Sequence, residues 1–160
     1  MNILMDNPKS VGSDMIVDVV AAIHEHPLPL VVIDMGTATT LSVADKKGNY
    51  IGGVILPGLR VSLNSLSGKT AQLPYISLEV PNKVIGKNTI DCMRSGIMYG
   101  NAAMLDGLID RMEEEIGEKA TIIATGGLAR LVTPLCHHSI DFEEDLLLKG
   151  LLILYEKNKK

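Results

Sequence analysis

Aromatic side chains are scarce in this sequence: they make up 3% of it, with a single Phe and no Trp. The core must therefore be filled by Leu, Ile, Val, Met and Ala, and few side chains are available to stack on nucleobases. Positive charge is not in excess either, since 15 Lys and Arg face 19 Asp and Glu, for a net charge of −4. That balance argues against nucleic-acid binding, which needs clustered Lys and Arg to neutralise phosphates.

Cysteine is also rare, with only Cys92 and Cys136, and no charged-then-apolar leader follows Met1. Nothing therefore indicates secretion or a disulfide framework. No apolar run reaches the roughly 20 residues that span a bilayer, so we expect a cytoplasmic protein without a membrane segment. With 46% hydrophobic and 21% charged residues among 160, the composition is that of one globular domain with a real core.

The first third of the chain shows a helical period followed by strand-like runs. Apolar residues from Met15 to Ile23 recur at helical spacing, which predicts an amphipathic helix over residues 11–25. Three strands are predicted next, over 28–34, 38–45 and 49–58. The sequence Asp45 to Asn49 predicts a hairpin turn between the second and third strands.

The rest of the chain is predicted to alternate helices and strands. A short helix over 59–67 and an extended loop over 68–88 precede a long helix from Thr89 to about Glu115. The expected elements that follow are a strand over 119–125, a helix starting at Leu128, a short strand and a final helix over 143–156. The final helix is apolar on most sides, so we expect it to be either deeply packed or part of an interface.

This order predicts an α/β fold: a ribonuclease H-like, actin-type (ASKHA) domain, whose mixed sheet has three antiparallel strands first and helices on its faces. Actin-type phosphotransferases normally contain two such units with the nucleotide between them, and this chain is long enough for one. We interpret residues 1–27 as a helical segment that joins to an N-terminal domain, and residues 28–160 as the C-terminal actin-like domain.

The strongest chemical motif is Asp34-Met35-Gly36-Thr37, an acidic residue at a strand end followed by a Gly-Thr turn. The glycine lets the backbone approach a phosphate, the N–H groups and the threonine hydroxyl can donate to its oxygens, and the carboxylate can hold a cation. A hairpin turn with a polar rim is the alternative explanation.

Asp14 lies in the first turn of the first predicted helix. There it either stabilises the positive helix end or accepts a proton from a hydroxyl that is being phosphorylated. A paired-glycine turn, Gly126-Gly127, follows a predicted strand. Such a turn can admit a nucleotide against the backbone, or it is only a tight turn.

Six ordered segments together resemble the type III pantothenate kinase family. They match its patterns NPxxVGxDxxxxxxAA, VIDxGTATT, GGxIxPG, LP, IGKxT with MxSG, and TGG, and they run from about Asn7 to Leu154. The resemblance implies ATP-dependent phosphorylation of pantothenate to 4'-phosphopantothenate, the first step of coenzyme A biosynthesis. It also implies a homodimer that needs Mg²⁺ or another divalent cation and a monovalent cation, K⁺ or NH₄⁺.

The resemblance also implies roles for particular residues. By motif position, Asp14 is the general base and Gly12 lies in the pantothenate pocket. Thr89, and Ile55 across the same interface, are expected to reach pantothenate from the neighbouring subunit. The residues expected to bind ATP are Asp34, Gly36, Thr37, Gly126 and Gly127, of which Asp34 is also the expected metal ligand.

The sequence departs from the family pattern in two places. Met15 stands where the family usually has the arginine that can meet the acceptor's carboxylate, and this loses a planar bidentate partner. In addition, residues 1–160 contain no DxGNT-type phosphate loop, so we expect this chain to be inactive on its own. The alternative function is that of a non-catalytic homologue, a protein-binding accessory or regulatory factor.

Overall fold

Five strands form one mixed sheet in the computed structural model of the chain, which describes residues 1–69 and 73–159. The strands are β1 (Leu30–Met35), β2 (Ala38–Ala44), β3 (Tyr50–Pro57), β4 (Thr121–Thr125) and β5 (Asp141–Phe142). β1, β2 and β3 are antiparallel, whereas β4 pairs parallel to β1 and β5 parallel to β4, which gives the order β3-β2-β1-β4-β5. The predicted three-stranded antiparallel opening is confirmed.

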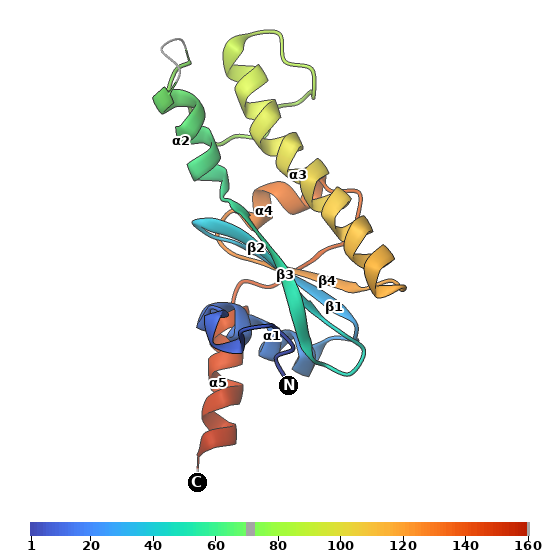
Figure 1. The fold of residues 1–160 in the computed structure, drawn as a ribbon. Coiled ribbons are helices and arrows are strands. Elements are labelled where there is room, and N and C mark those ends of the chain that lie inside the picture. The colour runs from blue at the N-terminus through green and yellow to red at the C-terminus, as the bar shows by residue number, and fades with distance from the viewer. Residues whose placement is uncertain (70–72, 160) are drawn as a thin grey trace.

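Helices cover both faces of this sheet (Figure 1). The helices are α1 (Ser13–Glu25), α2 (Leu59–Lys69), α3 (Thr89–Ile116), α4 (Ala129–Val132) and α5 (Leu146–Asn158), with 3-10 turns at Pro8–Ser10 and Thr133–Leu135. α1 and α5 pack together on one face, and α3 and α4 cover the other. α2 and the N-terminal half of α3 extend beyond the sheet as a paired arm, at the top of Figure 1.

The alternation of side chains along β1 divides the core in two. Leu30 and Val32 join the cluster under α1 and α5, whereas Val31, Ile33 and Met35 join the cluster under α3 and α4. Because successive strand side chains point to opposite faces, both faces of β1 are apolar. Asp34 has the parity of Val32, so its carboxylate lies on the face that α1 covers.

The final helix is less buried than a core helix. Only Leu146 and Gly150 of α5 are buried. The exposed apolar side chains of α5 are Leu147, Leu148, Leu151, Leu152 and Tyr155. Deep packing is thus wrong for α5, whose outer surface is apolar and open.

The predicted loop over 68–88 has no helix or strand in residues 73–88, whereas α2 continues through Lys69. Residues 70–72 of that prediction lie outside the described part of the chain. None of the helices in residues 1–69 and 73–159 is long and apolar enough to cross a membrane.

Candidate active site at the end of β1

Asp34 is the second-to-last residue of β1 and is half-buried. It is paired with Thr40 on β2 and with Thr125 on β4. Paired residues on neighbouring strands point to the same face of a sheet. A carboxylate flanked by two threonine hydroxyls therefore faces α1 at this edge.

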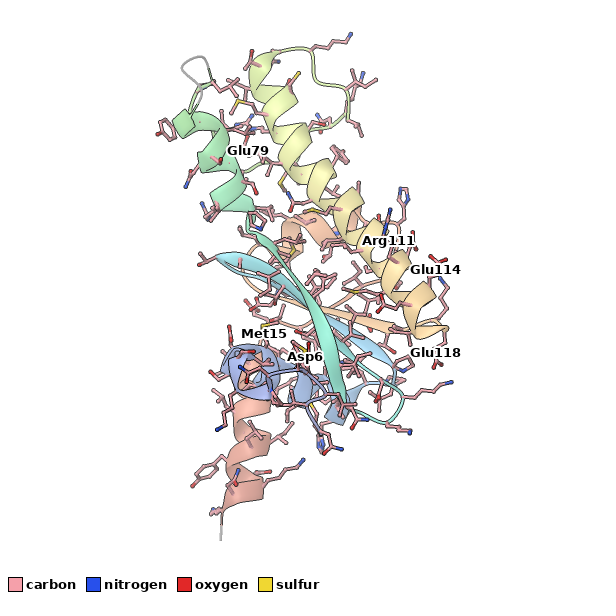
Figure 2. The ribbon with its side chains drawn as sticks, viewed as in Figure 1. Asp6, Met15, Glu79, Arg111, Glu114 and Glu118 are labelled. Carbon is pink, nitrogen blue, oxygen red and sulfur yellow. The ribbon has the colours of Figure 1, made fainter. Side chains whose placement is uncertain are left out.

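α1 brings two further carboxylates to the same place. The helix begins after the 3-10 turn Pro8–Ser10, with Gly12 as its N-cap, and Asp14 lies exposed in its first turn. A Cβ atom at Gly12 would lie 2.6 Å from Asp14 Oδ1, so glycine leaves the Asp14 carboxylate its space. Asp18, one turn further along, is only 3% exposed. Figure 2 labels Met15 at this end of α1.

The three carboxylates repel one another. Burial is the main cause that raises the pKa of Asp34, and the charge of Asp14 adds to it. Burial, followed by the charges of Asp34 and Asp14, raises the pKa of Asp18 from 3.8 to about 7. Within the described residues, no Lys, Arg or His forms an ion pair with any of the three.

Two glycine turns press against the loop that follows Asp34. The N–H of Gly58 donates to the carbonyl of Thr37 at 3.1 Å, and a Cβ at Gly58 would lie 2.2 Å from that oxygen. Gly126 has a φ of +98° and would bring a Cβ within 2.7 Å of the Met35 backbone. Both close approaches require glycine. Gly36 and Thr37 stay exposed between these turns, and the N–H of Gly36 donates to the Ala38 carbonyl at 3.1 Å.

The structure therefore brings together most of the residues predicted for the site. Gly12, Asp14, the Asp34 loop and the Gly126-Gly127 turn all lie about the end of β1. Thr89 does not, because it begins α3 at the far tip of the arm (Figure 1). Ile55 on β3 pairs with Thr40 on β2 and is 70% exposed.

Sequence reasoning missed Asp18. Its spacing of four residues from Asp14 places both carboxylates on one side of a helix, and this spacing was the available signal. Only the packing of α1 onto the sheet shows that Asp18 is buried.

The residues present fit a bound cation. Asp18 Oδ1 is buried and has no hydrogen-bond partner among the described residues, which is costly for a carboxylate unless a cation or a donor meets it. Carboxylate and hydroxyl oxygens are the ligands that hard cations such as Mg²⁺ prefer. Asp34, Asp18 and the neighbouring threonines supply that donor set.

The sheet order, the helices on both faces and the acidic edge of β1 define a ribonuclease H-like domain of the actin type. This fold recurs in a conserved protein of the Baf family of transcriptional activators from Campylobacter jejuni, at a TM-score of 0.66 and 21% identity over 89% of this chain and 64% of that one. It also recurs in component A of (R)-2-hydroxyglutaryl-CoA dehydratase from Acidaminococcus fermentans, at a TM-score of 0.51 and 16% identity over 87% of this chain and 64% of that one. The predicted fold class is confirmed.

Residues 1–111 match the model of the type III pantothenate kinase family. A type III pantothenate kinase from Exiguobacterium sp. is 46% identical over 160 residues, which are 100% of this chain and 63% of that protein. The chain belongs to the type III pantothenate kinase family, as its ordered motifs predicted. It spans less than two thirds of the length of this curated relative.

Proposed function

We propose that the chain carries the acceptor-activating part of an enzyme that phosphorylates pantothenate with ATP, giving 4'-phosphopantothenate in the first step of coenzyme A biosynthesis. The observation that carries this proposal is that Asp14 and the Asp34–Thr37 loop share one edge of the sheet in a member of this family. A proton acceptor and a phosphate loop are the two parts that a hydroxyl kinase must bring together.

In this mechanism Asp14 accepts the proton of the terminal hydroxyl of pantothenate as the hydroxyl oxygen attacks the γ-phosphorus of ATP. The bond from the γ-phosphorus to the bridging oxygen breaks, and ADP leaves. The N–H and hydroxyl of Thr37 donate to phosphate oxygens, Gly36 lets the phosphate approach the backbone, and the Gly126-Gly127 turn admits the adenosine. Gly12 leaves room for the acceptor beside Asp14.

Asp34 is the proposed ligand of the divalent cation, with Asp18 and the threonines beside it. When bound, such a cation neutralises the charge that develops on the transferring phosphate. A monovalent cation, K⁺ or NH₄⁺, is part of the same proposal. Both ions are proposed to bind beside the phosphates. Without them, the negative carboxylates would repel the negative phosphates of the nucleotide.

Catalysis is proposed to need more than these 160 residues. Positioning a phosphate chain requires donors on both of its sides, and the described residues supply those of one side. We propose that residues 1–27 join the actin-like domain 28–160 to a second domain that carries a DxGNT-type loop. The isolated chain is then expected to bind nucleotide weakly and not to turn over.

A homodimer is also part of the proposal. Thr89 begins α3 at the tip of the arm, whereas Asp14 lies on α1 at the other side of the sheet (Figure 1). Two copies can bring the arm of one to the site of the other. Exposed apolar side chains at the arm, including Tyr75, Ile85 and Ile90, support such an interface, because obligate interfaces are large and apolar.

The test of this function is Asp14→Asn in an assembly completed with the N-terminal part of a longer relative. Loss of a general base lowers turnover by roughly a hundred- to ten-thousand-fold, while circular dichroism should show an unchanged fold. The matched control is Glu114→Gln, which removes an exposed carboxylate from α3 and should leave turnover unchanged. Near-normal turnover of Asp14→Asn would refute the assignment.

The alternative is a non-catalytic accessory factor that binds protein partners. The structural likeness to a Baf family protein concerns the fold alone. If the completed assembly binds ATP and pantothenate but forms no product, with Asp14 intact, the accessory role replaces the kinase.

A further inference from the structure

The outer face of α5 is an apolar surface that the proposed reaction leaves unused. Five large side chains on it are between 41% and 64% exposed: Leu147, Leu148, Leu151, Leu152 and Tyr155. Because an α-helix has 3.6 residues per turn, they form one continuous stripe about 140° wide. We call these five residues the α5 outer stripe. Exposed apolar side chains that gather on one face in this way mark an interaction site, whereas scattered ones do not.

α5 is apolar on a second side as well. Leu146 and Gly150 are buried, and Ile153 packs against the apolar cluster that α5 shares with α1 and β1. By the same helical geometry, Lys149 and Glu156 fall in the narrow strip between this packed side and the outer stripe. A helix that is apolar on nearly all sides is typical of a buried position. The described domain covers α5 on one side only.

The second half of α5 has little support within the described chain. From Leu151 to the end of the helix no residue is buried, and this half extends away from the sheet (Figure 1). Isolated helices shorter than about 12–15 residues are marginal in water. We therefore expect residues 151–158 to fray in the chain alone and to become stable when another surface covers them.

The start of the chain lies on the same face of the sheet as α5. Ile3 and Met5 pack against the apolar cluster that contains Leu146 of α5, and Ile3 bridges to Tyr50 at the start of β3. A domain joined ahead of these residues would therefore begin beside the face that α5 covers. The arm at the other end of the domain carries its own exposed apolar side chains, Tyr75 and Ile85 among them, for the contact between two copies.

We propose that the α5 outer stripe is the docking surface for the N-terminal domain, so that α5 is packed between two domains. This inference rests on the proposed function for the presence of that domain, which residues 1–27 join to residues 28–160. The docked domain presents an apolar surface, because the stripe offers neither charge nor a hydrogen-bonding backbone group. Through the contact of Gly150 with Val17, docking onto α5 also holds α1, the helix that carries Asp14.

The experiment compares hydrogen–deuterium exchange of α5 in the purified 160-residue chain and in the chain fused at Met1 to the N-terminal part of the Exiguobacterium relative. Neither ATP nor pantothenate is present. We expect the amides of residues 151–158 to exchange at least about 10-fold more slowly in the fusion, because a covered helix opens less often than a fraying one. The amides of β1 should be protected in both proteins and serve as the internal reference.

The variant combines Leu148→Gln with Leu152→Gln. Glutamine has nearly the helix propensity of leucine, and both positions are exposed, so the Tm of the chain alone should change by less than about 2 °C. In the fusion, this variant should return residues 151–158 to the fast exchange of the chain alone. Glu156→Gln, in the polar strip of the same helix, is the matched control and should keep the slow exchange.

Two results would overturn the inference. One is a fusion whose N-terminal part is itself protected while residues 151–158 exchange as fast as in the chain alone. The other is a dimer of the unfused chain that protects α5 and that the double variant dissociates, which would assign the stripe to a second copy. Since the measurement needs no catalysis, an inactive fusion with a protected α5 would refute the kinase and support the docking surface, and an active fusion with an unprotected α5 would do the reverse.

Discussion

Replacing Gly150 with alanine tests how α1 is held against the rest of the domain. Gly150 lies at the contact of α5 with α1, where an added Cβ would lie 2.2 Å from Val17 O and 2.7 Å from Val17 Cγ1. Helix propensity alone predicts that the alanine stabilises α5 by about 1 kcal/mol. The contact with the Val17 carbonyl predicts the opposite, since a backbone atom cannot turn away as a side-chain end can.

The steric effect should win. Overpacking costs about 1–3 kcal/mol, and a 2.2 Å approach to a carbonyl belongs at the upper end, so we expect a net loss of about 2 kcal/mol. Gly100→Ala in α3 is the matched control, because Gly100 is exposed and a Cβ there meets nothing within 4 Å. That variant should gain about 1 kcal/mol.

Thermal and urea unfolding followed by circular dichroism measure both variants. At about 2–4 °C per kcal/mol for a domain of this size, Gly150→Ala should lower Tm by about 4–8 °C and Gly100→Ala should raise it by about 2–4 °C. Equal increases in both variants would refute the close α1–α5 packing. The positions of Asp14 and Asp18, which depend on that packing, would then be wrong as well.

Three further predictions concern pH and assembly. The pKa of Asp18 in the folded chain is raised above its unfolded value, so ionisation of Asp18 lowers the stability of the fold as pH rises from about 4 to 7. In EDTA at pH 8, Asp18→Asn should therefore be more stable than the wild type by up to about 4 kcal/mol. At pH 4 the variant should be no more stable than the wild type. Burial opposes ionisation of Glu143, but hydrogen bonds from Lys149 and His26 outweigh it and lower the pKa of Glu143. The stability that the ionised Glu143 adds is therefore present above its ordinary pKa and is lost as pH falls. The unfolding curves of Glu143→Gln and the wild type should converge in acid. Sedimentation should show a homodimer at micromolar concentration, and a stable monomer would contradict the proposed completion of the site by Thr89.

Much of the fold could be predicted from the sequence because apolar residues recur at clear helix and strand spacings. The β1–β3 strands and the long helix from Thr89 lie within a few residues of their predicted bounds. α5 begins at Leu146 rather than Glu143, because the Glu143 N–H donates to the Ala124 carbonyl and extends the pairing of β5 with β4. A sheet contact between residues far apart in the sequence leaves no periodic pattern in the local sequence, so it could not be predicted.

The candidate site likewise contains residues that the sequence could predict and one, Asp18, that it could not. Asp14, Asp34 and the paired glycines stand in local motifs, and the structure places these residues about the end of β1. Asp18 was missed because a polar residue on an amphipathic helix is ordinarily assigned to its solvent side. The buried surface of α1 is wider than one stripe, since both the sheet and α5 pack on it, and that width depends on tertiary structure.

The most direct test of the kinase assignment is a turnover assay with ATP, Mg²⁺, K⁺ and pantothenate, on the chain alone and on the chain fused to the N-terminal part of a longer relative. Mass spectrometry of the product identifies phosphopantothenate. We predict no measurable product from the chain alone and robust product from the fusion, lost again in the fused Asp14→Asn variant. A fusion that stays inactive, or a chain that turns over unaided, would contradict the account.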